Sequence, residues 1–227
     1  DGTVGGFNDI NSIPGVMWGI DITPAGQGLA SLLSWWGFMD YYSYSYAAVG
    51  NPKGMDAELY ANFKEDDIRK YQFSSSLQPR GKFYYKGAEA NNFRGFSGPQ
   101  SNIDSDSHYM RVAEMYLLHA EAAAENGNDA AARTSLKALL DLRIDDSSYV
   151  NALSGKALAE EAALQARLEL FAEGQSYFIM KRRRETRTRG TNWLDFSGES
   201  FSHSDERLTF EIPREEILFN PSVSDQN

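Results

Sequence analysis

The sequence predicts a mostly α-helical protein in which a tetratricopeptide-like helical hairpin carries long aromatic-rich loops and a few short strands. Residues 108–184 repeat apolar side chains at spacings of three and four, as one face of a helix does. Residues 1–107 are rich in Gly, Ser, Asn and aromatics, with prolines that interrupt any helical period. Residues 185–227 return to a loop-like composition. We therefore predict these three stretches as parts of one structural unit.

The N-terminal stretch has few regular elements. A short helix is expected over Met55–Phe63, after Pro52, and strands are expected over Met17–Ile22 and Lys82–Lys86. The remainder of residues 1–107 is expected to form loops.

The first long helix is predicted from an apolar face at helical spacing, made of Tyr109, Val112, Ala113, Tyr116, Leu117, Ala120 and Ala124. Gly127 and Asn128 are expected to end this helix, and Asp129 is the expected N-cap of the next. The next helix, Ala130–Arg143, places Leu136 and Leu140 on one face.

Two such helices joined by a short turn form a tetratricopeptide-like hairpin of about 34 residues. A third helix is expected from Gly155 to the neighbourhood of Gly174. A single hairpin needs neighbours to bury its faces, so further helices are expected from a partner or from an N-terminal half. Near the end of the chain, a strand is expected over Leu208–Ile212, followed after Pro213 by a short helical turn.

Composition excludes several classes of function. The net charge of −10 argues against nucleic-acid binding, which needs clustered positive charge. The chain has no cysteine, which excludes disulfides, a thiolate zinc site and a cysteine nucleophile. No cofactor is expected. A structural calcium site stays open, but Asp104, Asp106, Asp145 and Asp146 lack the spacing of an EF-hand, so turn and cap roles are expected.

Five segments stand in order along the chain: GFNDINSIPGVMWGIDIT (6–23), NPKGMDAELYANFKEDDIRK (51–70), YMRVAEMYLLHAEAAAENGN (109–128), RLELFAEGQSYFIMKRR (167–183) and FEIPREEILFNP (210–221). Together they resemble the SusD/RagB family. Gln226 and Asn227 also fit the usual ending of the family. One departure is Gln175, which stands where the family commonly has Arg after the Glu-Gly pair.

The resemblance implies a binding protein, not an enzyme. It implies a lipoprotein of a Bacteroidetes-type bacterium on the outer-membrane cell surface. Such a protein captures oligosaccharide or polysaccharide and delivers it to a SusC-like TonB-dependent transporter. The chain resembles the C-terminal half of the family, so the lipid anchor is expected in an N-terminal part.

The strongest candidate for glycan binding is the segment over residues 31–51, where seven aromatic residues fall within twelve positions. Exposed rings stack on the C–H faces of sugars, while small polar neighbours bind the hydroxyl groups. The candidate ligand-binding residues are Trp35, Trp36, Asp40, Tyr41, Tyr42, Tyr44 and Asn51. Two alternatives stay open: most of these rings are core, or Tyr42, Tyr44 and Tyr46 form one face of a strand.

Charged residues offer two further candidates. The first group is Arg167, Glu169, Glu173, Lys181 and Arg182, in which paired carboxylates are typical of glycosidases. We favour ion pairs that lock the helices together, because Glu169 and Glu173 share a helix face. The second candidate, KRRRETRTR (181–189), suits acidic polysaccharide, lipid head groups or nucleic acid. We favour its role as a helix end whose cations pair with local acids.

The rival interpretation is a tetratricopeptide-like scaffold that binds a protein partner and no carbohydrate. The predicted hairpin supports this interpretation equally well. Exposure of the rings in residues 31–51 discriminates between the two, because a glycan platform needs them at the surface.

Overall fold

The computed structural model describes residues 10–11, 13–21, 23, 54–79, 106–223 and 225. The protein is mostly helical, as predicted, and it divides into two units, Asp1–Ser176 and Tyr177–Asn227. The boundaries predicted near residues 107 and 184 stay predictions. None of the helices in the described ranges is long and apolar enough to cross a membrane.

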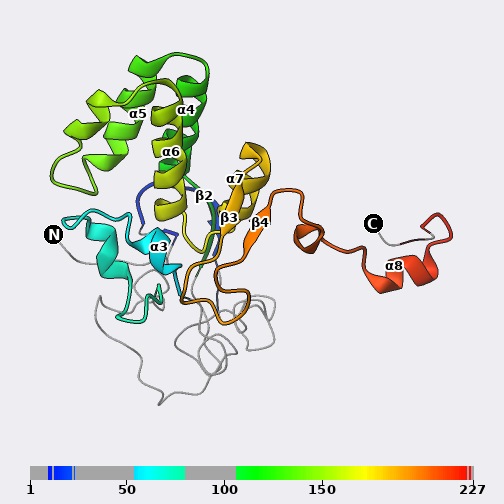
Figure 1. Ribbon diagram of the computed structural model, residues 1–227. Helices are drawn as coiled ribbons and strands as arrows, with labels where there is room; N and C mark the ends of the chain where they lie inside the picture. Colours follow the sequence, from blue (N-terminus) through cyan, green and yellow to red (C-terminus); the bar gives the residue numbers. More distant parts are fainter. Residues whose placement is uncertain are drawn as a thin grey trace. The chain divides into compact units, whose positions relative to one another are not determined.

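The first unit is built on three helices: α4 (Val112–Glu125), α5 (Asp129–Leu140) and α6 (Gly155–Glu169). Helix α4 packs against both α5 and α6 (Figure 1). Their contacts bury the leucines that the helical spacing predicts, including Leu117 on α4 and Leu136 and Leu140 on α5. The hairpin of α4 and α5 therefore confirms the tetratricopeptide-like prediction for residues 112–140.

The turn between α4 and α5 is fixed by its backbone. Gly127 has φ +77°, and the N–H groups of Gly127 and Asn128 donate to the carbonyls of Ala124 (3.0 Å) and Ala123 (2.8 Å). This is the Schellman arrangement, which satisfies the last carbonyls of a helix. Asn128 also caps α5, because its side chain accepts a hydrogen bond from the N–H of Ala131.

Asp129 is therefore not the N-cap of α5, and that prediction was wrong. Its carboxylate instead accepts a hydrogen bond at 2.9 Å from the N–H of Gly155, the first residue of α6. Asn128, one residue earlier, takes the capping position because it also completes the preceding turn.

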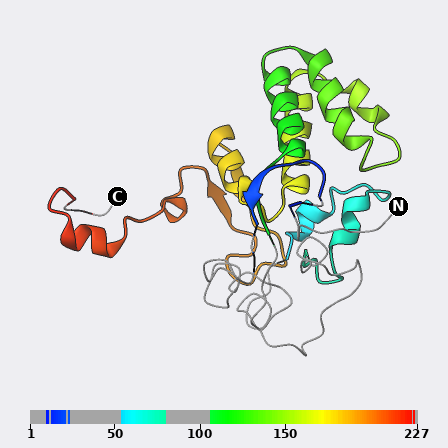
Figure 2. The same ribbon diagram turned by 180° about the vertical axis from the view of Figure 1, so that it is seen from behind.

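The N-terminal part of the first unit adds short elements. Strand β1 (Val16–Ile20) confirms the predicted strand, and it pairs antiparallel with β2 (Ser107–Arg111), as Figure 2 shows. Helix α3 (Ala57–Tyr60) lies within the predicted span and is followed by the 3₁₀ helix η1 (Ile68–Gln72). A second 3₁₀ helix, η3 (Ser148–Ala152), follows α5. Residues 82–86 lie outside the described residues.

A hydrophobic cluster packs around α3. It consists of Met55, Leu59, Phe63 and Leu168, with Tyr60, Phe73, Leu77, Leu164 and Phe171 packed around it. Leu168 belongs to α6, so this cluster joins the N-terminal part of the unit to α6.

Four further predictions about element bounds were wrong. Tyr109 lies in β2 and not in the first helix, because residues 107–111 pair with β1. Helix α5 ends at Leu140 and not at Arg143, with Asp141 as its C-cap. Helix α6 ends at Glu169, short of Gly174, with Leu170 as its C-cap, and the chain then turns through Ala172, where φ is +63°. No strand forms over Leu208–Ile212, where the chain leaves the 3₁₀ helix η4 (Glu206–Leu208) in an irregular conformation.

The second unit contains most of α7 (Gln175–Arg183), then β3 (Thr186–Thr188), β4 (Ser200–Ser202), η4 and α8 (Arg214–Phe219). Strands β3 and β4 pair antiparallel, with Thr186 opposite Ser202 and Thr188 opposite Ser200. Helix α8 confirms the short helical turn expected after Pro213.

Candidate functional site

The C-terminal end of α6 carries a buried carboxylate surrounded by arginines. Glu169 accepts hydrogen bonds from Arg111 (2.8 Å), from Arg143 (2.9 and 3.0 Å) and from Arg69 (3.3 Å). These arginines come from β2, from the turn after α5 and from η1. One carboxylate thus ties three segments to the end of α6.

The environment of Glu169 keeps it ionised. Burial by itself raises the pKa of the Glu169 carboxyl, but the hydrogen bond from Arg143 and the charges of Arg111, Arg143 and Arg69 lower it well below its ordinary value. A carboxylate held in this way cannot act as a general acid near neutral pH. The backbone carbonyl of Glu169 also accepts from Arg111 at 2.7 Å, which satisfies the end of the helix.

Arg111 extends the network to the next acidic residue. Its guanidinium donates to both carboxylate oxygens of Glu173, at 2.7 and 2.9 Å. Burial opposes the charge on Arg111, but its two carboxylate partners raise its pKa above the ordinary value. The expected pairing of Glu169 and Glu173 with a neighbouring arginine is therefore present. Together these contacts form a structural ion-pair network.

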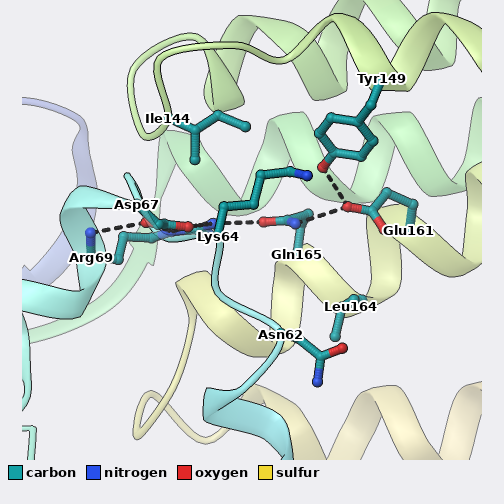
Figure 3. Close-up of a pocket in the computed structure, with 9 residues that line it drawn as sticks. All are labelled: Asn62, Lys64, Asp67, Arg69, Ile144, Tyr149, Glu161, Leu164 and Gln165. Carbon is teal, nitrogen blue, oxygen red and sulfur yellow. Dashed lines mark hydrogen bonds and ion pairs between the residues drawn. The ribbon is translucent and has the colours of Figure 1, made fainter.

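A polar pocket of about 200 Å³ lies beside this network (Figure 3). It is lined by Asn62, Lys64, Asp67, Arg69, Ile144, Tyr149, Glu161, Leu164 and Gln165. A relay of hydrogen bonds crosses it. Arg69 donates to the side-chain oxygen of Gln165 at 2.7 Å, and the amide nitrogen of Gln165 donates to Glu161 at 2.8 Å.

Tyr149 completes the relay on the opposite side of the pocket. Its hydroxyl donates to Glu161 at 2.6 Å, and Lys64 Nζ lies 4.0 Å from the centre of its ring. Burial, followed by the hydrogen bond to Glu161, raises the pKa of the Tyr149 hydroxyl. The pocket is smaller than the roughly 300–1,000 Å³ of most small-molecule sites. Because the polar atoms of the relay already bond to one another, we assign this pocket to the scaffold.

An exposed aromatic pair lies on the β1–β2 sheet. The ring centroids of Trp18 and Tyr109 are 4.9 Å apart with an interplanar angle of 40°, and the side chains are 60% and 46% exposed. Two neighbouring rings with exposed faces form an apolar surface against which another ring can stack.

The sequence did not single out this pair. Trp18 was expected in a strand, but Tyr109 was expected in a helix, so nothing brought the two rings together. Residues 107–111 show no alternation of polar and apolar side chains, so the sequence carries no signal for this contact. In the sheet, Trp18 pairs with Met110 and Gly19 with His108, and this irregularity in register places Tyr109 between the two pairs, beside Trp18.

The candidate residues predicted from composition lie in a different part of the chain. Trp35, Trp36, Asp40, Tyr41, Tyr42, Tyr44 and Asn51 all lie outside the described residues. Their part in binding stays a prediction.

Other charged candidates take structural positions. Lys181 lies 5.4 Å from the ring of Tyr177, and Lys181, Arg182 and Arg183 occupy the last turn of α7, as expected for cations at a helix end. Arg167 likewise lies in the last turn of α6.

Two of the aspartates considered for calcium accept hydrogen bonds from backbone N–H groups. Asp106 accepts from the N–H of Ile10 at 2.8 Å, and Asp146 accepts from the N–H of Ser148 at 2.8 Å. Asp145 donates its own N–H to Asp66, also at 2.8 Å. Within the described ranges, no three His, Cys, Asp or Glu side chains gather as a metal site would require. Asp104 lies outside those ranges.

Solved structures with a similar fold come from Bacteroides species. A SusD-like carbohydrate binding protein from Bacteroides vulgatus matches with a TM-score of 0.65 and 22% identity, over 94% of this chain and 48% of its own. A SusD superfamily protein from the same species matches with a TM-score of 0.63 and 19% identity, over 94% and 46%. A third, from Bacteroides thetaiotaomicron, has a TM-score of 0.55 and 22% identity, over 75% and 39%.

These identities establish similarity of fold. The chain spans less than half the length of these three relatives. A search of curated proteins gave no match. The model of the SusD family matches residues 32–217, which is most of the sequence and includes the ion-pair network at the end of α6. The chain therefore belongs to the SusD family.

Proposed function

We propose that this protein captures glycan at the outer-membrane surface and delivers it to a SusC-like TonB-dependent transporter. The observation that carries the proposal is the family match over residues 32–217. It is supported by the likeness to a structure described as a SusD-like carbohydrate binding protein. On this proposal the protein is a binding protein without catalytic activity, held at the outer membrane through a lipid anchor.

The exposed pair of Trp18 and Tyr109 gives the proposal a physical basis. A pyranose ring presents apolar C–H groups on its faces, which stack on indole and phenol rings. Side chains that are 60% and 46% exposed leave ring surface for such contact. A second contribution is expected from Trp35 and Trp36, whose segment combines rings with serine and glycine.

Affinity electrophoresis of the full chain in gels that contain neutral or acidic polysaccharides tests the proposal. Two double variants are compared with the wild type: Trp35→Ala with Trp36→Ala, and Trp18→Ala with Tyr109→Ala. Tyr71→Ala is the matched control, because Tyr71 is an aromatic residue of η1 that is 66% exposed.

We expect at least one polysaccharide to retard the wild type and the Tyr71→Ala control. We expect one or both double variants to lose that retardation by tenfold or more in affinity, which corresponds to about 1.4 kcal/mol. The transporter is tested separately by co-purification of the lipidated protein from outer membranes. Absence of both retardation and a co-purified transporter would refute the proposal.

A tetratricopeptide-like scaffold is the second candidate function. It is favoured by Val112 and Tyr116, which lie one turn apart on α4 and stay 40% and 41% exposed. Repeat helices use such faces to contact neighbouring helices or partners. If no polysaccharide retards the protein, this second function becomes the better explanation of the fold.

A further inference from the structure

The loop between β3 and β4 gathers aromatic rings around one arginine. The guanidinium carbon of Arg189 lies 4.4 Å from the ring centre of Trp193, 5.2 Å from that of Phe196 and 4.7 Å from that of Phe201. Phe201 is buried, whereas Trp193 and Phe196 are 43% and 50% exposed. We call Arg189, Trp193 and Phe196 the hairpin-tip platform.

The backbone holds this platform in place. The N–H of Arg189 donates to Glu199 (2.9 Å), and its carbonyl accepts from Gly198 (3.0 Å), so the ladder of β3 and β4 continues into the loop. Phe196 has φ +56°, a conformation that bulky side chains rarely adopt, and its carbonyl accepts from the N–H of Glu199 at 3.1 Å. The loop thus keeps an aromatic ring beside Arg189 despite an unfavourable backbone conformation.

Arg189 differs from two arginines of its basic run in its partners. Arg183 and Arg187 both pair with Glu185, at 2.7 and 2.8 Å. Within the described part of the chain, Arg189 has no carboxylate partner. Its guanidinium makes one hydrogen bond, from Nη1 to the backbone oxygen of Asp195 at 3.0 Å. Within the described residues, four of its five N–H donors make no other hydrogen bond.

We propose that the hairpin-tip platform binds a carboxylate-bearing sugar, a uronic acid residue of an acidic glycan. The guanidinium fork matches a planar carboxylate through two parallel N–H···O bonds. The exposed ring of Trp193 is beside it to stack on the sugar face, so both features of a uronic acid meet complementary groups. This inference rests on the proposed glycan capture, and it names the class of glycan.

Long-range attraction does not explain such binding. The chain carries a net charge of −10, so its long-range interaction with an acidic polymer is a repulsion. At physiological salt this repulsion is screened beyond about 8–10 Å. Selectivity for a uronic acid must then come from direct contact with Arg189. Removing the carboxylate from the polymer should therefore have the same effect as removing the guanidinium from the protein.

Affinity electrophoresis of the full chain tests this equivalence. The gels contain polygalacturonate, alginate or hyaluronate, or the same polymers with their carboxylates reduced to alcohols. The variants are Arg189→Gln, Arg189→Lys and Trp193→Ala. Arg184→Gln is the matched control, because Arg184 belongs to the same basic run and its removal changes the net charge equally. Mobility in polymer-free gels corrects for the charge change.

We expect at least one uronate polymer to retard the wild type and Arg184→Gln, and its reduced form to bind at least tenfold more weakly. Arg189→Gln and Trp193→Ala should each lose at least tenfold in affinity for the uronate form. Arg189→Lys keeps the cation over the rings but lacks the fork, so it should fold normally and still lose most of the binding. Arg189→Gln should bind the reduced polymer as weakly as the wild type does.

The wild type alone can overturn the inference: it does so if a uronate polymer and its reduced form retard it equally. Wild-type affinity in Arg189→Lys would also overturn it. If neutral polysaccharides retard the wild type but no uronate polymer does, the platform proposal fails while glycan capture stands. If no polymer of either kind retards the protein, both proposals fail together.

Discussion

Replacing Glu169 by Gln tests whether the ion-pair network holds the first unit together. The change keeps the size of the side chain and removes its charge. The Glu169 side chain is 4% exposed, so water cannot take over the role of the carboxylate. The surrounding guanidinium groups would then face a neutral amide in a buried site.

The expected loss in the free energy of unfolding depends on the partners that each arginine retains. Removing one partner of a buried ion pair costs about 3–5 kcal/mol. Arg69 retains Asp67 at 2.7 Å, and Arg111 retains Glu173 at 2.7 Å. The Arg143 side chain is 22% exposed, so water can solvate it in part. These remaining interactions put the loss near the lower limit, at about 3 kcal/mol.

Urea unfolding followed by circular dichroism measures this loss, and thermal unfolding gives a second readout. For a chain of this size, about 3 kcal/mol corresponds to a fall in Tm of about 6–12 °C. Glu160→Gln is the control, because Glu160 is an α6 residue that is 54% exposed and pairs with Lys156 at 3.5 Å. Its expected loss is below about 0.5 kcal/mol. Equal losses in the two variants would show that the network does not stabilise the fold.

Two further predictions follow from the same unit. In the folded protein, the pKa of Glu169 lies well below its ordinary value of 4.5. Its charge therefore contributes fully to stability above pH 4.5, and this contribution is lost as the pH falls from 4.5 through the lowered pKa. The stability difference between the wild type and Glu169→Gln should therefore narrow below about pH 4.5, and a constant difference down to pH 3 in urea titrations would contradict this. Leu136→Ala removes a fully buried side chain of α5 and should lower the free energy of unfolding by about 2–5 kcal/mol. Leu142→Ala is the control, because this side chain is 67% exposed, and its free energy of unfolding should change by no more than about 0.5 kcal/mol. Similar urea midpoints for the two variants would argue against the packing of α4 on α5.

The helical hairpin was predictable because its determinants are local. Spacing identified Leu136 and Leu140 as buried, and Gly127 and Asn128 marked the turn. A helix needs only neighbours three and four positions away, so its face can be recognised within one segment. The N-cap was assigned one residue too late, because Asn128 serves the preceding turn and the following helix at once.

Elements that depend on contacts between residues far apart in the sequence were harder to predict. Residues 107–111 form a strand only because they pair with residues 16–20, almost ninety positions earlier. Glu169 and Arg69 are 100 positions apart, so the sequence could predict that Glu169 pairs with an arginine but not with which one. The strand expected over Leu208–Ile212 failed for the same reason: its apolar residues have no strand beside them in the described part of the chain.

The same distinction applies to the two candidate aromatic surfaces. The density of rings around Trp35 and Trp36 is visible in the sequence, but density alone does not separate a binding loop from a core. The rings of Trp18 and Tyr109 are exposed in the structure, but their pairing depends on a contact between distant segments. Because the two double variants remove different rings, their results are independent. Loss of binding in both would mean that one glycan chain uses both surfaces, and loss in one would assign glycan binding to that pair of rings.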